Sequence, residues 1–111
     1  MCVFCKIIAG EIPSERLYED DDMIIIKDIN PQAKIHLLMI PKEHFPDITA
    51  MNDKQAATLA RMLKTLGGLT DKLGLENGFR LVSNKGDDGC QSVPHLHIHI
   101  LGGEKLSENM A

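Results

Sequence analysis

The sequence predicts an α+β fold in which a mostly antiparallel five-stranded sheet, covered on one face by helix, accompanies one long and one short helix. Short apolar runs alternate with turn residues, which is typical of strands in hairpin-like succession. One long stretch and one short stretch repeat their apolar residues every three or four positions, which predicts helices. With 111 residues and 43% hydrophobic residues, the chain is expected to form one domain, 1–111, with one core.

The first half of the chain predicts a short helix and three strands. Apolar residues at helical spacing end at Gly10, with Pro13 beyond it, so we expect a short helix within Phe4–Ile12. Two β-rich runs follow on either side of an acidic turn, which is typical of a hairpin. A third run begins after a break at Asn30 and Pro31. The expected strands are Arg16–Glu19, Met23–Ile29 and Ile35–Ile40.

The second half predicts the long helix and two further strands. Apolar residues recur at helical spacing over Asp53–Leu73, where Asn52 can cap the start and Gly74 can end the helix. Gly67 and Gly68 interrupt this pattern at a cost of about 1 kcal/mol each relative to alanine. They are not a phosphate loop, because no strand precedes them and no GK[ST] follows. The remaining strands are expected at Phe79–Asn84 and His95–Leu101, joined by the loop Lys85–Pro94.

Charge and composition narrow the classes of function. The net charge of −4 lacks the basic surface that binding to a phosphate backbone requires. Hydrophobic runs such as Leu37–Ile40 are far shorter than the roughly 20 residues that span a bilayer. An odd number of cysteines, Cys2, Cys5 and Cys90, suits a reducing compartment in which thiols bind metal or stay free. We therefore expect a soluble, cytoplasmic protein with neither nucleic acid nor a membrane as partner.

Three of the five histidines alternate with aliphatic residues at His95, His97 and His99. In a strand they would share one face, about 6.6 Å apart in steps of two residues, while the aliphatic side chains enter the core. Three imidazoles with near-neutral pKa values can provide a nucleophile, a proton donor and phosphate ligands. Two other interpretations stay open from the residues alone: a polar strand face exposed to water, and a His-x-His metal site like those of zinc hydrolases.

The pair Cys2-Val-Phe-Cys5 is a separate signal. A C-x-x-C motif is consistent with half of a zinc site, a redox pair or coincidence. A thioredoxin-like motif needs a strand before it and a helix after it, and only one residue precedes Cys2. The redox interpretation is therefore disfavoured.

The sequence resembles the histidine triad (HIT) family, whose motif is His-φ-His-φ-His-φ-φ with φ apolar. The segment His95–Leu101 matches every position of the motif. The resemblance covers residues 1–103 and leaves 104–111 as a polar tail. Other matching segments are Phe4–Ile8, Glu11–Pro13, Asp28–Gln32, His36, Ile40–His44, Gly78–Val82 and Gln91–Val93. The pattern is most similar to the histidine triad nucleotide-binding (Hint) branch, in its bacterial zinc-containing type.

This resemblance implies a homodimeric hydrolase, a phosphoramidase that acts on purine nucleoside phosphoramidates and related nucleotidyl conjugates. His97 would attack the α-phosphorus and form a nucleotidyl-histidine intermediate that water hydrolyses, with no metal needed for the chemical step. His99 would bind a phosphate oxygen and help move protons, and His36 would face the triad from a neighbouring strand. Two alternatives remain: a nucleotide-binding regulatory protein with incidental hydrolysis, and a metal-dependent hydrolase that uses the three-histidine face.

The resemblance also implies the contacts of the nucleotide. Asp28 would accept both ribose hydroxyls, since a carboxylate can receive two donors at once. Ser92 would hydrogen-bond the leaving-group side of the phosphate, and Asn84 would orient the phosphate or the triad. Backbone amides around Gln91 and Val93 would hold the phosphate. The expected apolar slot for the base consists of Phe4, Ile7, Ile12, Ile29 and Leu38.

Some bacterial members of the family complete the C-x-x-C with the histidine of a Pro-Lys-x-His segment and the first triad histidine. Two thiolates and two imidazoles form a closed structural zinc shell. The corresponding metal ligands in this sequence are Cys2, Cys5, His44 and His95. The chain departs from the family pattern twice. Cys90 replaces the usual glycine beside the phosphate, and the tail after Gly103 lacks the tryptophan that some animal members use near the leaving group.

Overall fold

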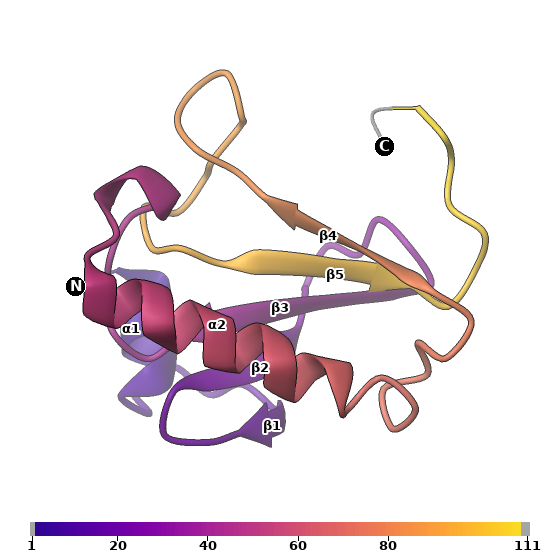
Figure 1. Ribbon diagram of the computed structural model, residues 1–111, viewed down its shortest axis with the longest axis horizontal. Coiled ribbons are helices and arrows are strands. Elements are labelled where there is room, and N and C mark those ends of the chain that lie inside the picture. The colour runs from indigo at the N-terminus through magenta and orange to yellow at the C-terminus, as the bar shows by residue number, and fades with distance from the viewer. Residues whose placement is uncertain (1, 110–111) are drawn as a thin grey trace.

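The chain folds into a five-stranded sheet with a helix on each face (Figure 1). The computed structural model describes residues 2–109. The sheet has the order β1-β2-β3-β5-β4, and every neighbouring pair is antiparallel. This confirms the predicted α+β class, the five strands and the two helices. The elements are α1 (Val3–Ile8), β1 (Arg16–Glu19), β2 (Met23–Lys27), β3 (Ile35–Pro41), the short 3-10 helix η1 (Ile48–Ala50), α2 (Asp53–Gly67), β4 (Phe79–Ser83) and β5 (Ile98–Gly102).

The central strands β2 and β3 bury side chains on both of their faces. Met23 and Ile25 belong to the apolar cluster that includes α2, whereas Ile24 and Ile26 belong to a second cluster on the opposite face. A strand that is buried on both faces has a continuous run of apolar residues, and the sequences of β2 and β3 contain such runs. The expectation that helix covers only one face is wrong, because α1 packs Phe4 and Ile7 into the second cluster.

Helix α2 is shorter than its apolar periodicity predicts. It starts with a capping box, in which the side chains of Asn52 and Gln55 each accept the other's backbone N–H. It ends at Gly67, with Gly68 as C-cap, rather than at Leu73. Two successive glycines disfavour the helix, so the chain turns there. The apolar spacing continues because the following turns face the same core, where Leu73 still packs.

Strand β5 also begins later than predicted. The expected strand His95–Leu101 is observed only from Ile98 to Gly102. Both neighbours of β5 stop pairing at Ile98, opposite Met39 of β3 and Ser83 of β4. The segment before it is held instead by a bond from Leu96 N–H to Phe45 O at 2.7 Å. The aliphatic side chains still alternate into the core below α2, as expected, at Leu96, Ile98 and Ile100.

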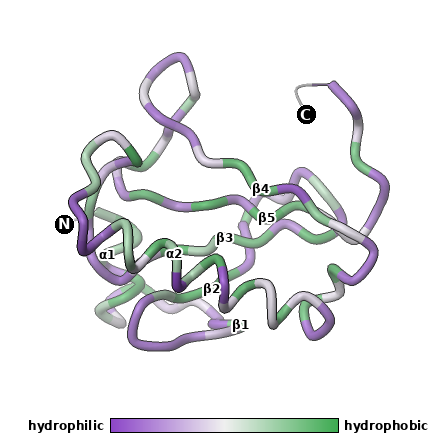
Figure 2. Tube along the Cα trace, viewed as in Figure 1, coloured by the Kyte–Doolittle hydropathy of each residue, from purple (hydrophilic) through white to green (hydrophobic). Residues whose placement is uncertain are grey.

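The acidic turn between β1 and β2 joins this hairpin to α2, and Figure 2 shows the turn as hydrophilic. The Asp20 carboxylate accepts the backbone N–H groups of Asp22 and Met23, which shapes the turn. Asp22 forms a two-bond ion pair with Arg61 of α2, at 2.9 and 3.0 Å. The predicted hairpin is confirmed. Within the described part of the chain, no helix has the length and apolar character needed to cross a membrane.

Candidate functional site

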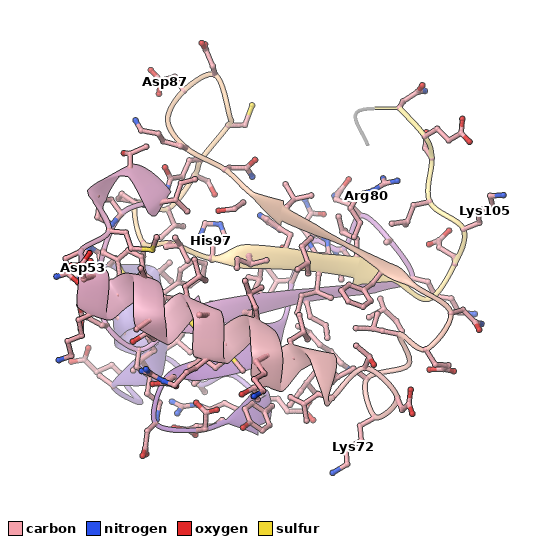
Figure 3. All side chains as sticks on the ribbon, viewed as in Figure 1. Asp53, Lys72, Arg80, Asp87, His97 and Lys105 are labelled. Atoms are coloured by element: carbon pink, nitrogen blue, oxygen red, sulfur yellow. The ribbon has the colours of Figure 1, made fainter. Side chains whose placement is uncertain are left out.

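A cavity of about 370 Å³ lies on the face of the sheet that α1 partly covers. His97, which Figure 3 shows at the start of β5, lies in its wall together with His99. The cavity also contains Asp28, Ser92 and Val93, so the structure brings these predicted residues together. The five side chains expected to form the base slot all line it: Phe4, Ile7, Ile12, Ile29 and Leu38.

Backbone hydrogen bonding assigns the tautomer of His97. Its Nδ1 lies 2.7 Å from the carbonyl oxygen of His95. A carbonyl oxygen can only accept, so Nδ1 carries the proton and Nε2 keeps its lone pair. The His97 side chain is buried but lines the cavity. The hydrogen bond at Nδ1 therefore makes Nε2 the ring nitrogen that can act as a nucleophile toward a ligand in the cavity.

A second chain of hydrogen bonds assigns the tautomers of His36 and His99. The backbone N–H of Gln32 donates to Nδ1 of His36 at 2.9 Å, so the His36 proton is on Nε2. This Nε2 lies 2.9 Å from Nδ1 of His99 and donates to it. The remaining proton of neutral His99 is therefore on Nε2. His36 faces the triad from β3, as expected, and His99 is left with an N–H donor on its other nitrogen.

The carboxylate of Asp28 completes this group. Its Oδ2 lies 3.3 Å from Nε2 of His36, and its Oδ1 accepts the N–H of Asn30 at 2.8 Å. Asp28, His36 and His99 are close enough together to hold a cation, but His36 uses Nδ1 as an acceptor and Nε2 as a donor. It has no lone pair left for a metal ion in this arrangement. The donor set therefore disfavours a metal-dependent reaction centre here.

Burial favours the neutral form of His99. Desolvation lowers the pKa of His99 below its ordinary value of 6.5, and the nearby imidazoles of His97 and His36 lower it further. The Asp28 carboxylate opposes this effect and only partly compensates for it. Near pH 7, His99 therefore acts as a neutral hydrogen-bond donor rather than as a cation.

Two residues predicted to contact the nucleotide, Gln91 and Asn84, do not line the cavity. The side chain of Gln91 accepts the N–H of Gly86 at 3.0 Å and donates to the carbonyls of Pro46 and Val93 at 2.7 and 3.1 Å. Its amide thus holds the loop before β5 in place. Asn84 follows β4, and neither side chain is among the residues that line the cavity.

The sequence interpretation missed five lining residues, namely Val3, Pro13, Ser14, Ile26 and Lys27. The alternation along β2 places Ile26 on the same face as Ile24, so its position was open to inference. Ser14 lies in an irregular connection between α1 and β1, and no spacing signal indicates its contact with the cavity.

Next to the cavity, four donors converge on one point. The Sγ atoms of Cys2 and Cys5 lie 3.2 to 3.5 Å from the Nδ1 atoms of His44 and His95, and these two nitrogens are 3.1 Å apart. A tetrahedral zinc shell separates its donors by roughly 3.4 to 3.8 Å, so the predicted ligand set is assembled in a slightly compact form. The Nε2–H of His95 donates to Pro41 O at 2.8 Å, which leaves the lone pair of Nδ1 on the side of the thiols.

The charge state of this cluster also suits a cation. Burial lowers the pKa of His95, so its Nδ1 is unprotonated near neutral pH. Burial raises the pKa of Cys5, and the neighbouring Cys2 raises it further. Two adjacent thiolates are therefore unfavourable unless a positive charge lies between them. A bound metal ion supplies that charge.

Phe4 lies between the four-donor cluster and the cavity. It stands between the two cysteines in sequence, and its ring is buried. The ring centroid lies 4.9 Å from that of His97 and 5.9 Å from that of His95, in both cases edge to face. The ring of Phe4 thus contacts both His95 of the four-donor cluster and His97 of the cavity wall.

Cys90 keeps the backbone conformation of the glycine that it replaces. Its φ is 56°, in the left-handed region that favours glycine. The side chain is exposed and does not line the cavity. The substitution therefore retains the loop path at a conformational cost of about 1–2 kcal/mol.

Comparison with known proteins identifies the family. Residues 1–110 match the family model described as scavenger mRNA decapping enzyme C-term binding. The chain is 45% identical over 101 residues to protein HitA of Neisseria gonorrhoeae, covering 91% of this chain and 94% of that protein. It is 40% identical over 107 residues to a 14 kDa zinc-binding protein of Brassica juncea, covering 95% of both.

Comparison with solved structures leads to the same family. The fold matches a HIT family hydrolase of Legionella pneumophila with a TM-score of 0.92 and 42% identity, covering 100% of both chains. It also matches a histidine triad nucleotide-binding protein of Candida albicans with a TM-score of 0.80 and 36% identity, covering 90% of this chain and 73% of that one. Sequence, fold and the arrangement of the three histidines therefore agree that the chain belongs to the histidine triad family.

Proposed function

We propose that the protein is a nucleotide-binding hydrolase that cleaves purine nucleoside phosphoramidates or related nucleotidyl conjugates at the α-phosphorus. The observation that carries this proposal is the hydrogen bond from His97 Nδ1–H to His95 O, which leaves Nε2 as a nucleophile in the cavity wall. The names of two structural relatives, a hydrolase and a nucleotide-binding protein, support it.

The reaction proceeds in two displacements at phosphorus. In the first, Nε2 of His97 attacks, the bond between phosphorus and the leaving nitrogen breaks, and the released amine takes up one proton. In the second, water displaces Nε2, nucleoside monophosphate leaves, and one proton is released, so the protons balance. His99 donates its Nε2–H to a phosphate oxygen, and Ser92 hydrogen-bonds the leaving group. Covalent attack divides one difficult hydrolysis into two easier steps.

The cavity suits a neutral purine nucleoside. Asp28 is held by Asn30 N–H and lies beside His36, and its remaining lone pairs can accept two ribose hydroxyls. The slot is aliphatic apart from Phe4, whose ring meets the His97 ring edge to face. A positively charged methylated cap base would favour stacking between aromatic faces, which this slot does not provide. The substrate we propose is therefore an ordinary purine conjugate rather than an mRNA cap.

Replacing the nucleophile tests the proposed chemistry. His97→Ala should lower kcat/KM on adenosine 5′-phosphoramidate by at least about a thousand-fold, because the covalent route is lost. The nucleotidyl adduct seen by phosphorus NMR after rapid quenching should disappear as well. Lys54→Ala, an exposed change on α2, serves as the control and should retain both. Full turnover by the His97→Ala variant would show that another group attacks phosphorus.

Replacing the ribose acceptor tests the binding mode. Asp28→Ala should raise KM for the adenosine substrate by about ten- to a hundred-fold, since a hydrogen bond to a charged group contributes about 1.5–3 kcal/mol. The 2′,3′-dideoxy analogue should show little change in KM. Removal of Asp28 can also disturb the neighbouring His36, and that disturbance should lower kcat for both substrates to the same extent. An equal rise of KM for both would remove Asp28 from the ribose site.

We also propose that Cys2, Cys5, His44 and His95 hold one structural zinc ion. Four protein ligands close the shell and leave no position for a reactive water. Zinc would fasten the N-terminus of α1 to the segment before β5, while His97 acts on phosphorus without it. The zinc-binding name of the Brassica juncea relative supports the identity of the metal.

Metal removal tests this proposal. The purified protein should contain about one zinc ion per chain, and X-ray absorption should report two sulfur and two nitrogen ligands. Chelation should lower the melting temperature, because metal binding is linked to folding. Cys5→Ser should have the same effect, whereas Cys90→Ser, a change of an exposed thiol, should keep the zinc. Protein prepared without chelator and found free of zinc would refute the site.

We propose further that the chain forms a homodimer through β4 and α2. In the described sheet β4 is an edge strand, and α2 lies over β3 rather than over β4 (Figure 1). Large apolar side chains on these two elements are therefore exposed: Leu63 by 42%, Phe79 by 40% and Leu81 by 38%. An open edge beside apolar side chains favours pairing with a second copy around a two-fold axis.

A charge placed on β4 tests the dimer. Leu81→Glu should convert a dimer into a monomer in sedimentation velocity at micromolar protein, because the two copies would bury carboxylates against each other. Ile48→Glu changes another exposed apolar residue, on η1, and should leave the dimer intact. A wild-type protein that sediments as a monomer at every concentration would rule the interface out.

A further inference from the structure

A second cavity has its aliphatic floor on the opposite face of the sheet from His97, and it shares Lys27 and Asp28 with the nucleotide cavity where β2 ends. Its volume is about 460 Å³. Four aliphatic side chains line it and also pack in the α2 cluster, whereas the nucleotide cavity is built on the other apolar cluster. These four residues are Leu17, Ile35, Leu37 and Leu73. His36 is the one lining residue with an aromatic ring, and the rest of the apolar surface is aliphatic, so it suits an aliphatic group rather than a purine.

Three exposed lysines surround this aliphatic surface: Lys27, Lys34 and Lys72. Figure 3 shows Lys72 reaching outward from the turns after α2. Among residues 2–109 the only lysine in an ion pair is Lys42, so these three ammonium groups have no carboxylate partner there. In a chain of net charge −4, they form a local positive region.

Two carboxylates lie near the lysines, and neither forms an ion pair with them. The Glu104 carboxylate accepts the backbone N–H of Lys34. Asp28 borders the cavity, but its carboxylate is directed to Asn30 N–H and to His36. Long lysine side chains can lay their methylene groups along an apolar surface and keep the ammonium in water. The cavity thus combines an aliphatic floor with a positive rim, and its volume lies within the usual range for small-ligand sites, about 300–1,000 Å³.

We propose that this second cavity binds a small amphipathic anion, with an aliphatic body and one carboxylate or phosphate head. The body would displace water from the four aliphatic side chains, and the head would lie among the three ammonium groups. Both parts of the ligand are needed. The aliphatic floor gives an inorganic anion no apolar contact, and the lysine rim gives a neutral alcohol no charge to pair with.

Binding can be mapped by heteronuclear NMR on the full, zinc-loaded chain. Decanoate and decyl phosphate are the two anionic probes, which distinguish a carboxylate from a phosphate source. Decanol and inorganic phosphate are the controls that keep only one part of the ligand. We expect saturable amide shifts around Leu17 and Leu73 with an anionic probe, and affinity for decanol lower by about tenfold or more, as expected for the loss of one charge contact. Inorganic phosphate should not saturate.

Charge reversal gives the matched comparison. The Lys34→Glu/Lys72→Glu double variant should lose about tenfold or more in affinity, because attraction becomes repulsion. The Lys54→Glu/Lys105→Glu double variant changes the net charge equally on residues that do not line this cavity, and should bind like the wild type. Equal weakening in both variants, or shifts confined to Phe4 and Val93 in the nucleotide cavity, would overturn the proposal. So would an absence of saturable binding by both anionic probes.

Discussion

The arrangement of the candidate active site depends on one hydrogen bond, from His97 Nδ1–H to the carbonyl oxygen of His95. This carbonyl is free to accept because the chain leaves the sheet before Ile98, where pairing with both β3 and β4 ends. In a continued ladder, backbone groups of this segment would be engaged by a neighbouring strand. The late start of β5 therefore gives His97 its tautomer and leaves Nε2 for the role that we propose.

Hydrogen bonding holds this group of partly or fully buried histidines in place. Among residues 2–109, no buried side-chain nitrogen or oxygen lacks a hydrogen-bond partner. An unpaired buried polar group would cost about 1–3 kcal/mol, so the backbone contacts of His95, His97 and His36 contribute to the stability of the fold. The same contacts assign each proton. They leave Nε2 of His97 and Nε2–H of His99 outside these contacts, as the proposed nucleophile and donor require.

The N-terminal segment connects the four-donor cluster to the apolar slot. Cys2 and Cys5 face His44 and His95, while Phe4 between them packs against the ring of His97. Helix α1 has only six residues, too few to be stable alone, so its position depends on these tertiary contacts. Loss of the cluster contacts would therefore displace α1 and with it the Phe4 wall of the slot. The four cluster residues, although far apart in sequence, thus belong to one structural unit with the slot.

The sequence by itself determined the five strands, the two helices, the alternation of His95, His97 and His99 with core aliphatics, and the pairing of Cys2 with Cys5 in one turn. These features are local, because strand and helix periods are carried by neighbouring residues. Only the tertiary structure decided where α2 ends, where β5 begins, which nitrogen of the cavity histidines carries the proton, and that Gln91 holds a loop rather than lining the cavity. Each of those outcomes depends on a partner distant in sequence, such as Pro41 for His95 or Pro46 for Gln91, and no local period encodes such a partner.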